Sequence, residues 1–148
     1  MNQKKHVIYV LVNYHSRLNR LTRVIAWCSR FVENCRAKIK KENRKSSELS
    51  SKEINNALKM CIRQAQDIEF AEEKRNLQKK MTVFEQSKIK SLHPMLDEDG
   101  VLKVGGRITQ STLDYEEMHP TILPANHRIT SLIIWHAHAT TGILKLSD

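Results

Sequence analysis

The amino-acid sequence predicts a mainly α-helical fold: an antiparallel helical hairpin, followed by a small β-containing module and a terminal helix. Apolar residues recur every three or four positions over residues 16–41 and again from residue 54 onward, which is the spacing of amphipathic helices. The composition changes after Lys80, where Pro94 and several glycines interrupt this pattern with short extended runs. A last helical pattern follows Pro124.

The first predicted helix covers residues 16–41 and has one apolar and one cationic side. Its apolar stripe is formed by Leu18, Leu21, Ile25, Cys28, Val32, Cys35 and Ile39, and is widened by Val24 and Phe31. Arg23, Arg30 and Lys41 lie opposite this stripe, with Arg20 and Lys38 on the flank. These five side chains can neutralise backbone phosphates in a salt-sensitive and sequence-independent way, but basic helix faces also serve simply as solvated surface.

The overall charge has the same uneven distribution. The chain carries a net charge of +9, yet residues 1–45 alone hold twelve Lys and Arg against two Asp and Glu, a net of +10. The remaining residues have a net charge of −1. A basic first third attached to a neutral remainder indicates contact with DNA, RNA or another polyanion.

A second helix is predicted after the polar segment "KENRKSSELSS". Ser50 and Glu53 match a capping box, in which each side chain satisfies a backbone donor near the other residue. The apolar stripe that follows runs through Phe70 to about Lys80 and includes Ile54, Leu58, Cys61, Ile62, Ala65 and Ile68. Two amphipathic helices joined by a short polar loop are expected to pack antiparallel.

The segment after Lys80 contains turn and strand signals. "DEDG" (residues 97–100) predicts a turn, because it lacks the ligand spacing of a calcium loop. Val101–Val104 predicts a short strand, and Gly105-Gly106 a bend before Arg107-Ile108. "HPTILP" is bracketed by two prolines, so it is expected to form only a short extended segment.

Asn126 is predicted to cap the last helix. Ile129, Leu132, Ile133 and His136 share one face of that helix, while Ile134 and Trp135 lie on the other side. A helix that is apolar on two sides is expected to have packing partners on both.

The residue types that carry catalysis or bind metals do not form a complete site. His136 and His138 point apart on a helix, and His127 is too far from His138 to share an ion with it. The three cysteines, Cys28, Cys35 and Cys61, form no CxxC pair and are interpreted as small hydrophobes in a reducing compartment, the cytoplasm or nucleus. No nucleophile elbow, phosphate-binding loop, secretory signal or membrane span is recognisable.

Four stretches in this order carry a resemblance: "SRLNRLTRVIAWCSRFVENCR", "LSSKEINNALKMCIRQAQDIEFAEEKRNL", "IKSLHPMLDEDGVLKVGGRITQS" and "HPTILPANHRITSLIIWHAHATTG". The chain resembles the polyprotein of BEL/Pao-type LTR retrotransposons, in the region between RNase H and the integrase core. The resemblance covers residues 16–142 and divides the chain into an unmatched lead (1–15), the helical hairpin (16–80), a pre-integrase connector (81–124) and the truncated start of the integrase zinc-binding domain (125–148).

The resemblance also implies a ligand set. The zinc-binding domain of that family uses two histidines and two cysteines, and His138 matches the first of them. Residues 141–144 read Thr-Gly-Ile-Leu where the second histidine is expected, and no cysteine follows Cys61. The acidic triad of the integrase core would lie beyond Asp148. The resemblance therefore implies an incomplete zinc site, no bound cofactor and no catalytic activity in this chain.

The sequence leaves three functions open, one of which is a zinc-dependent integrase fragment. The first of the other two is a non-catalytic polyprotein fragment that binds DNA or RNA through Arg20, Arg23, Arg30, Lys38 and Lys41. The second is a helical protein-interaction module that binds neither nucleic acid nor metal. It would dock other polyprotein parts or a second copy through its helices, and no membrane contact is expected.

Overall fold

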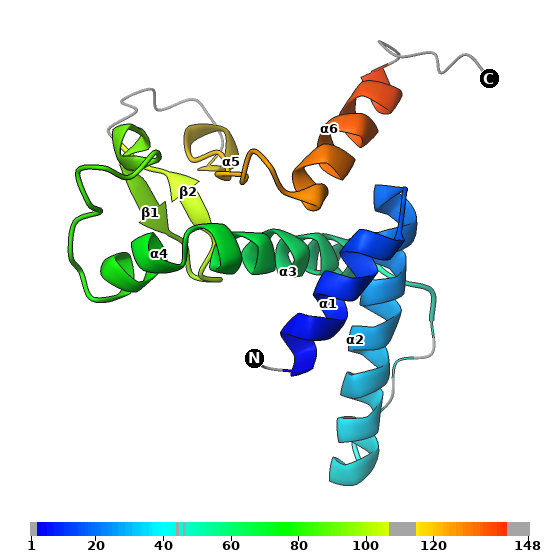
Figure 1. Ribbon diagram of the computed structural model, residues 1–148. Helices are drawn as coiled ribbons and strands as arrows, with labels where there is room; N and C mark the ends of the chain where they lie inside the picture. Colours follow the sequence, from blue (N-terminus) through cyan, green and yellow to red (C-terminus); the bar gives the residue numbers. More distant parts are fainter. Residues whose placement is uncertain (1–2, 44, 46, 107–114, 142–148) are drawn as a thin grey trace. The chain divides into compact units, whose positions relative to one another are not determined.

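The computed structural model describes residues 3–43, 45, 47–106 and 115–141. In chain order the elements are α1 (Gln3–Tyr14), α2 (Leu18–Lys40), α3 (Ser51–Glu69), α4 (Ala71–Gln78), the 3-10 turn η1 (Lys90–Leu92), β1 (Pro94–Leu96), β2 (Leu102–Val104), α5 (Tyr115–Met118) and α6 (Arg128–Thr141) (Figure 1). The fold is mainly helical, with two long helices that pack together, one small antiparallel sheet and a terminal helix, as predicted. None of the described helices is long and apolar enough to cross a bilayer.

The chain forms two compact units. Unit 1 consists of Met1–Cys61 and Asn126–Asp148, and unit 2 of Ile62–Ala125. Because α3 begins in unit 1 and ends in unit 2, one boundary falls inside a helix. This division differs from the four predicted segments, since it follows which residues pack together rather than where the composition changes.

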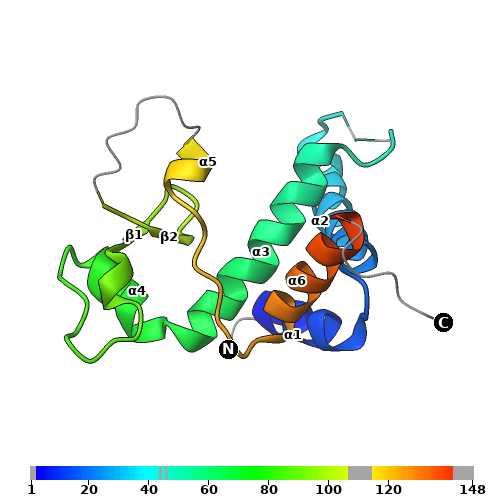
Figure 2. The same ribbon diagram turned by 90° about the horizontal axis from the view of Figure 1, so that it is seen from above.

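Unit 1 contains a core formed by α1, α2 and α6, which lie against one another (Figures 1 and 2). Its buried side chains come from all three helices and include Val12, Leu21, Ile25, Ile129 and Leu132. The sequence assigned no helix to residues 1–15, so α1 is a finding of the structure. His127 rather than the predicted Asn126 occupies the N-cap of α6, where its Nδ1 accepts the Ile129 N–H at 3.2 Å.

The loop between α2 and α3 is closed at both ends by local hydrogen bonds. Lys41 adopts a left-handed conformation (φ 58°) after α2, and the Glu42 N–H donates to the Ala37 carbonyl at 2.8 Å, a common way to end a helix. The predicted capping box starts α3: the Ser50 N–H donates to Glu53 Oε2 at 2.9 Å and the Glu53 N–H donates to Ser50 Oγ at 3.3 Å.

The second predicted helix is divided by a break that the sequence did not indicate. α3 ends at Glu69, Phe70 has φ −123° and ψ 36°, and α4 starts at Ala71. Phe70 and Leu77 pack against the core of unit 2, which is formed by Ile89, Leu102 and Ile122. The predicted inner position of Ile68 is wrong, because its side chain is half exposed.

The sheet of unit 2 is a hairpin of β1 and β2, with Leu96 paired to Leu102. The predicted turn connects the strands: the Gly100 N–H donates to the Asp97 carbonyl at 3.0 Å and the Val101 N–H to Asp97 Oδ1 at 2.8 Å. Gly105 is required after β2, because a Cβ there would lie 2.3 Å from the His93 carbonyl oxygen. Arg107-Ile108 lie outside the described residues.

The predicted extended segment "HPTILP" lies beside β2. His119 Nδ1 is 3.0 Å from the Val104 carbonyl, the Val104 N–H donates to the Pro120 carbonyl at 2.9 Å, and the Ile122 N–H donates to the Leu102 carbonyl at 3.0 Å. Gln66 of α3 connects the segment and the strand. Its Nε2 donates to the carbonyls of Leu102 (3.0 Å) and Ile122 (2.7 Å), and its Oε1 accepts the Leu102 N–H at 2.8 Å.

Candidate nucleic-acid interface

Four of the five predicted cations lie in solvent. Arg20, Arg23 and Lys38 are exposed on α2, and Lys41 is exposed immediately after its last residue. Among the described residues, no Asp or Glu lies within ion-pair distance of any of the four. Cations that form no ion pair within the protein remain available to attract a polyanion.

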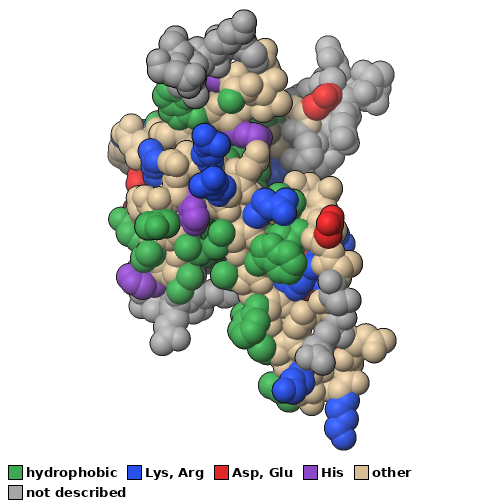
Figure 3. Space-filling model, turned by 90° about the vertical axis from the view of Figure 1, so that its right-hand side faces the viewer, with side chains coloured by type: hydrophobic (Ala, Val, Ile, Leu, Met, Phe, Trp, Pro, Cys, Tyr) green, Lys and Arg blue, Asp and Glu red, His purple; other side chains and the backbone are tan. Residues whose placement is uncertain are grey.

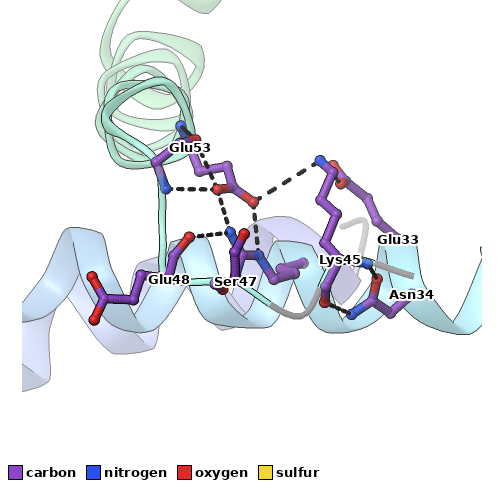
Figure 4. A network of polar contacts seen from close by, with 8 residues as sticks. Glu33, Asn34, Lys45, Ser47, Glu48 and Glu53 are labelled. Carbon is purple, nitrogen blue, oxygen red and sulfur yellow. Dashed lines mark hydrogen bonds and ion pairs between the residues drawn. The ribbon is translucent and has the colours of Figure 1, made fainter. Parts of the chain in front are cut away.

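Arg30 corrects the prediction, because it is buried (3% exposed) rather than part of the outer surface. Its Nε donates to Glu53 Oε1 at 2.8 Å and its Nη2 to Glu53 Oε2 at 2.5 Å (Figure 4). The guanidinium also donates to the backbone carbonyls of Ser47 and Glu48. Four hydrogen bonds from Arg30 therefore hold the loop and the start of α3, and its guanidinium is not part of the phosphate-binding surface.

The ion pair between Arg30 and Glu53 shifts the pKa values of both residues. The hydrogen bonds from Arg30, followed by those from the backbone and side chain of Ser50, lower the pKa of Glu53 to about 2. The hydrogen bond to Glu53 raises the pKa of Arg30. Both groups therefore stay charged throughout the neutral range.

Glu33, the one acidic residue of α2, has a partner of its own. Lys45 Nζ donates to Glu33 Oε2 at 2.8 Å, and this hydrogen bond raises the pKa of Lys45. Asn34 holds the Lys45 backbone from both sides, with two hydrogen bonds of 2.9 Å (Figure 4). The carboxylate of Glu33 is thus neutralised and opposes the neighbouring cations only weakly.

The side of α2 that carries Arg20, Arg23 and Lys38 (the cationic face) also carries two aromatic side chains, which the sequence pattern did not predict there. Trp27 is 48% exposed and Phe31 is 69% exposed, although the pattern assigned Phe31 to the apolar stripe. Their spacing in the sequence could have placed these rings beside the cations, because residues seven apart share a helix face. Trp27 follows Arg20 by seven residues, and Lys38 follows Phe31 by seven. On the face seen in Figure 3, hydrophobic and Lys/Arg side chains lie next to one another and Asp and Glu are sparse.

The predicted apolar stripe of α2 is buried only in its first half. Leu18, Leu21 and Ile25 are buried, whereas Val32 and Ile39 are exposed, as are the side chains of Cys28 and Cys35. The interpretation of the cysteines as packed hydrophobes is therefore wrong for these two. It holds for Cys61, where burial raises the pKa of the thiol to about 12.

A cleft of about 590 Å³ adjoins the cationic face at Arg20. The start of α2 contributes Arg17 and Arg20 to its lining, and α6 contributes Leu132, Trp135 and His136. Trp135 is 54% exposed and Ile134 is 49% exposed. The side of α6 that the sequence predicted to need a partner is thus uncovered by the residues that the structure describes.

His138 does not form part of a metal site in the described part of the chain. It is half-buried in the last turn of α6, and no group of three or more His, Cys, Asp or Glu lies close enough to hold an ion there. A tetrahedral zinc site needs three or four ligands. The described residues around His138 do not fit the zinc that the resemblance implies for the intact domain.

Comparison with known proteins yields no relative: no family model, no curated protein and no solved structure matches this chain. The likeness to BEL/Pao-type polyproteins therefore rests on the sequence motifs alone.

Proposed function

We propose that the chain is a non-catalytic part of a BEL/Pao-type retrotransposon polyprotein that binds nucleic acid without sequence specificity. The observation that supports this proposal most strongly is the exposure of Arg20, Arg23, Lys38 and Lys41 along one helix, with no described carboxylate within ion-pair distance of them. Arginine and lysine on such a surface contact phosphates, which carry no information on base sequence.

The exposed cations predict how binding depends on salt. Each phosphate that a cation neutralises releases condensed counterions, so four neutralised phosphates give a slope of log Kd against log salt of about 3 to 4 in magnitude. Since the cations bind the backbone, oligonucleotides of different sequence are expected to bind with similar affinity at any one salt concentration.

The test is a filter-binding titration across a salt series with the double variant Arg20→Gln/Arg23→Gln. We expect weaker binding and a slope reduced by about 2, since each cation removed leaves one phosphate with its counterions. The matched control is Arg75→Gln/Lys79→Gln, which removes the same charge from exposed positions at the end of α4 and should bind as the unaltered chain does. An equal decrease in affinity in both variants would show that only net charge matters, and binding that ignores salt would refute the proposal.

A second function, a protein-interaction module, is favoured by the exposed side of α6. Trp135 and Ile134 are about half exposed beside the cleft at the start of α2, and an exposed aromatic of this kind often anchors a protein interface. In this case Trp135→Ser is expected to abolish self-association in sedimentation velocity, at low and high salt alike. A chain that sediments as a monomer at every concentration would remove self-association from consideration.

A further inference from the structure

The exposed aromatic rings on α2 carry an inference that rests on the proposed function and specifies its ligand. Trp27 and Phe31 are one helical turn apart, on the stretch of α2 between Arg23 and Lys38. We propose that this face binds single-stranded nucleic acid in preference to duplex, with the two rings stacking on bases and the cations contacting the phosphates around them.

The two rings are largely free of the protein's own packing. Phe31 is 69% exposed and Trp27 48% exposed, so a large part of each ring contributes little to the core. Isolated hydrophobic side chains on a surface are common. Two aromatic rings at successive turns, flanked by cations on both sides, form the combination that single-strand binding proteins use.

The indole ring of Trp27 is held in place by Arg30. The Arg30 guanidinium lies 5.0 Å from the centre of the indole ring, within cation–π range. Arg30 is itself held by Glu53 and by the carbonyls of Ser47 and Glu48. The indole therefore rests on a fixed support and still exposes half of its surface, which lowers the entropy cost of stacking a base on it. Arg30 acts here as a positioning residue.

Exposed aromatic rings favour single-stranded over double-stranded nucleic acid. In a duplex the base faces are stacked inside the helix, so an aromatic side chain can reach the backbone and the base edges but cannot stack on a base face. An unpaired strand offers its base faces, and stacking on them is largely independent of sequence. The cations attract both forms, whereas Trp27 and Phe31 add affinity for the single strand alone.

The length of the face sets the size of the site. Arg20 and Lys38 are eighteen residues apart on α2, about 27 Å at a rise of 1.5 Å per residue. A strand that advances about 3.4 Å per nucleotide would cover this distance with roughly eight nucleotides. Affinity should rise with oligonucleotide length up to about eight and change little beyond it.

The experiment uses the full chain with Trp135→Phe, which leaves Trp27 as its one tryptophan. The probes are oligo(dT) of four to sixteen nucleotides, a 20-base-pair duplex, and heparin as a polyanion without bases. We expect oligo(dT) to quench Trp27 fluorescence and heparin at equal occupancy to leave it unchanged. In the same background Phe31→Ala should weaken oligo(dT) binding roughly 5- to 150-fold and leave heparin binding unaltered.

The control is Phe84→Ala, which removes an aromatic ring of similar exposure (51%) from unit 2 and should have no effect on binding. If Phe31→Ala binds oligo(dT) normally, or if the duplex binds as tightly as the single strand, the preference for single strands is refuted. The proposed function would then stand, provided that Arg20→Gln/Arg23→Gln still weakens binding. Absence of binding to every probe refutes both. Loss of self-association in Phe31→Ala, without any change in oligo(dT) affinity, would assign the face to a protein partner and overturn the inference.

Discussion

Replacing Gln66 by leucine is expected to destabilise the chain by about 2–6 kcal/mol, with the effect centred on unit 2. Gln66 is completely buried, and its amide is the partner of the Leu102 N–H and the Ile122 carbonyl. Among the hydrogen bonds of the described residues outside the β1–β2 pairing, these two backbone groups have no other partner. Leucine would leave both unpaired away from water, at about 1–3 kcal/mol each.

Two measurements test this result. Urea denaturation gives the change in the free energy of unfolding, and amide hydrogen exchange locates it: the Leu102 amide should exchange much faster in Gln66→Leu, while the amides of α2 keep their protection. Gln78→Leu, the same chemical change at an exposed position of α4, serves as the control. Protection of Leu102 equal to that in the unaltered chain would show that Gln66 does not hold β2.

Glu53→Gln is expected to cause the largest loss of stability in unit 1. The substitution removes the charge that faces the buried guanidinium of Arg30, and a buried charge without its partner is strongly destabilising. It also weakens the capping box with Ser50 at the start of α3. Glu33→Gln is the matched control, because it removes a carboxylate whose ion pair with Lys45 is more than half exposed and should contribute little.

The same pair makes a prediction for acid solutions. The pKa of Glu53 falls from an ordinary 4.5 to about 2 on folding, so the unfolded chain binds the proton more readily between these values. The stabilisation by Glu53 is therefore complete above pH 4.5 and is lost as the pH falls toward 2. Thermal melts followed by circular dichroism at several pH values should show the melting temperatures of the unaltered chain and of Glu53→Gln converging at low pH. The reason is that Glu53→Gln has no carboxylate at this position to titrate. A constant difference between pH 5 and pH 2 would contradict this expectation.

Local features of the structure could be predicted from the sequence, because local geometry determines them. The capping box needs only Ser50 and Glu53 at the correct spacing, and the turn after β1 needs only Asp97 and a glycine at position 100. The mainly helical class follows from periodicity in the same way. By contrast, α1 has a continuous apolar run without a clear period, so no pattern marked it as a helix.

The candidate site was predicted only in part, because position on a helix does not determine burial. Arg23 and Arg30 are seven residues apart and share one side of α2, yet Arg23 is exposed and Arg30 is buried. The difference arises from the loop and from Glu53, which reach Arg30 from a distant part of the sequence. The exposure of Phe31 and the conformation of Phe70 likewise depend on neighbours that no local pattern specifies.

The division of unit 1 into two chain segments affects when this unit can fold during synthesis. α1 and α2 leave the ribosome before unit 2, whereas α6, which supplies the buried side chains of Ile129 and Leu132, follows only after the whole of unit 2. At translation rates of about 5–20 residues per second, the apolar surface of Leu21 and Ile25 would stay without its packing partner α6 for several seconds. Unit 2 is continuous in sequence and can fold first. A nascent chain arrested before Asn126 would expose that uncovered surface to chaperones.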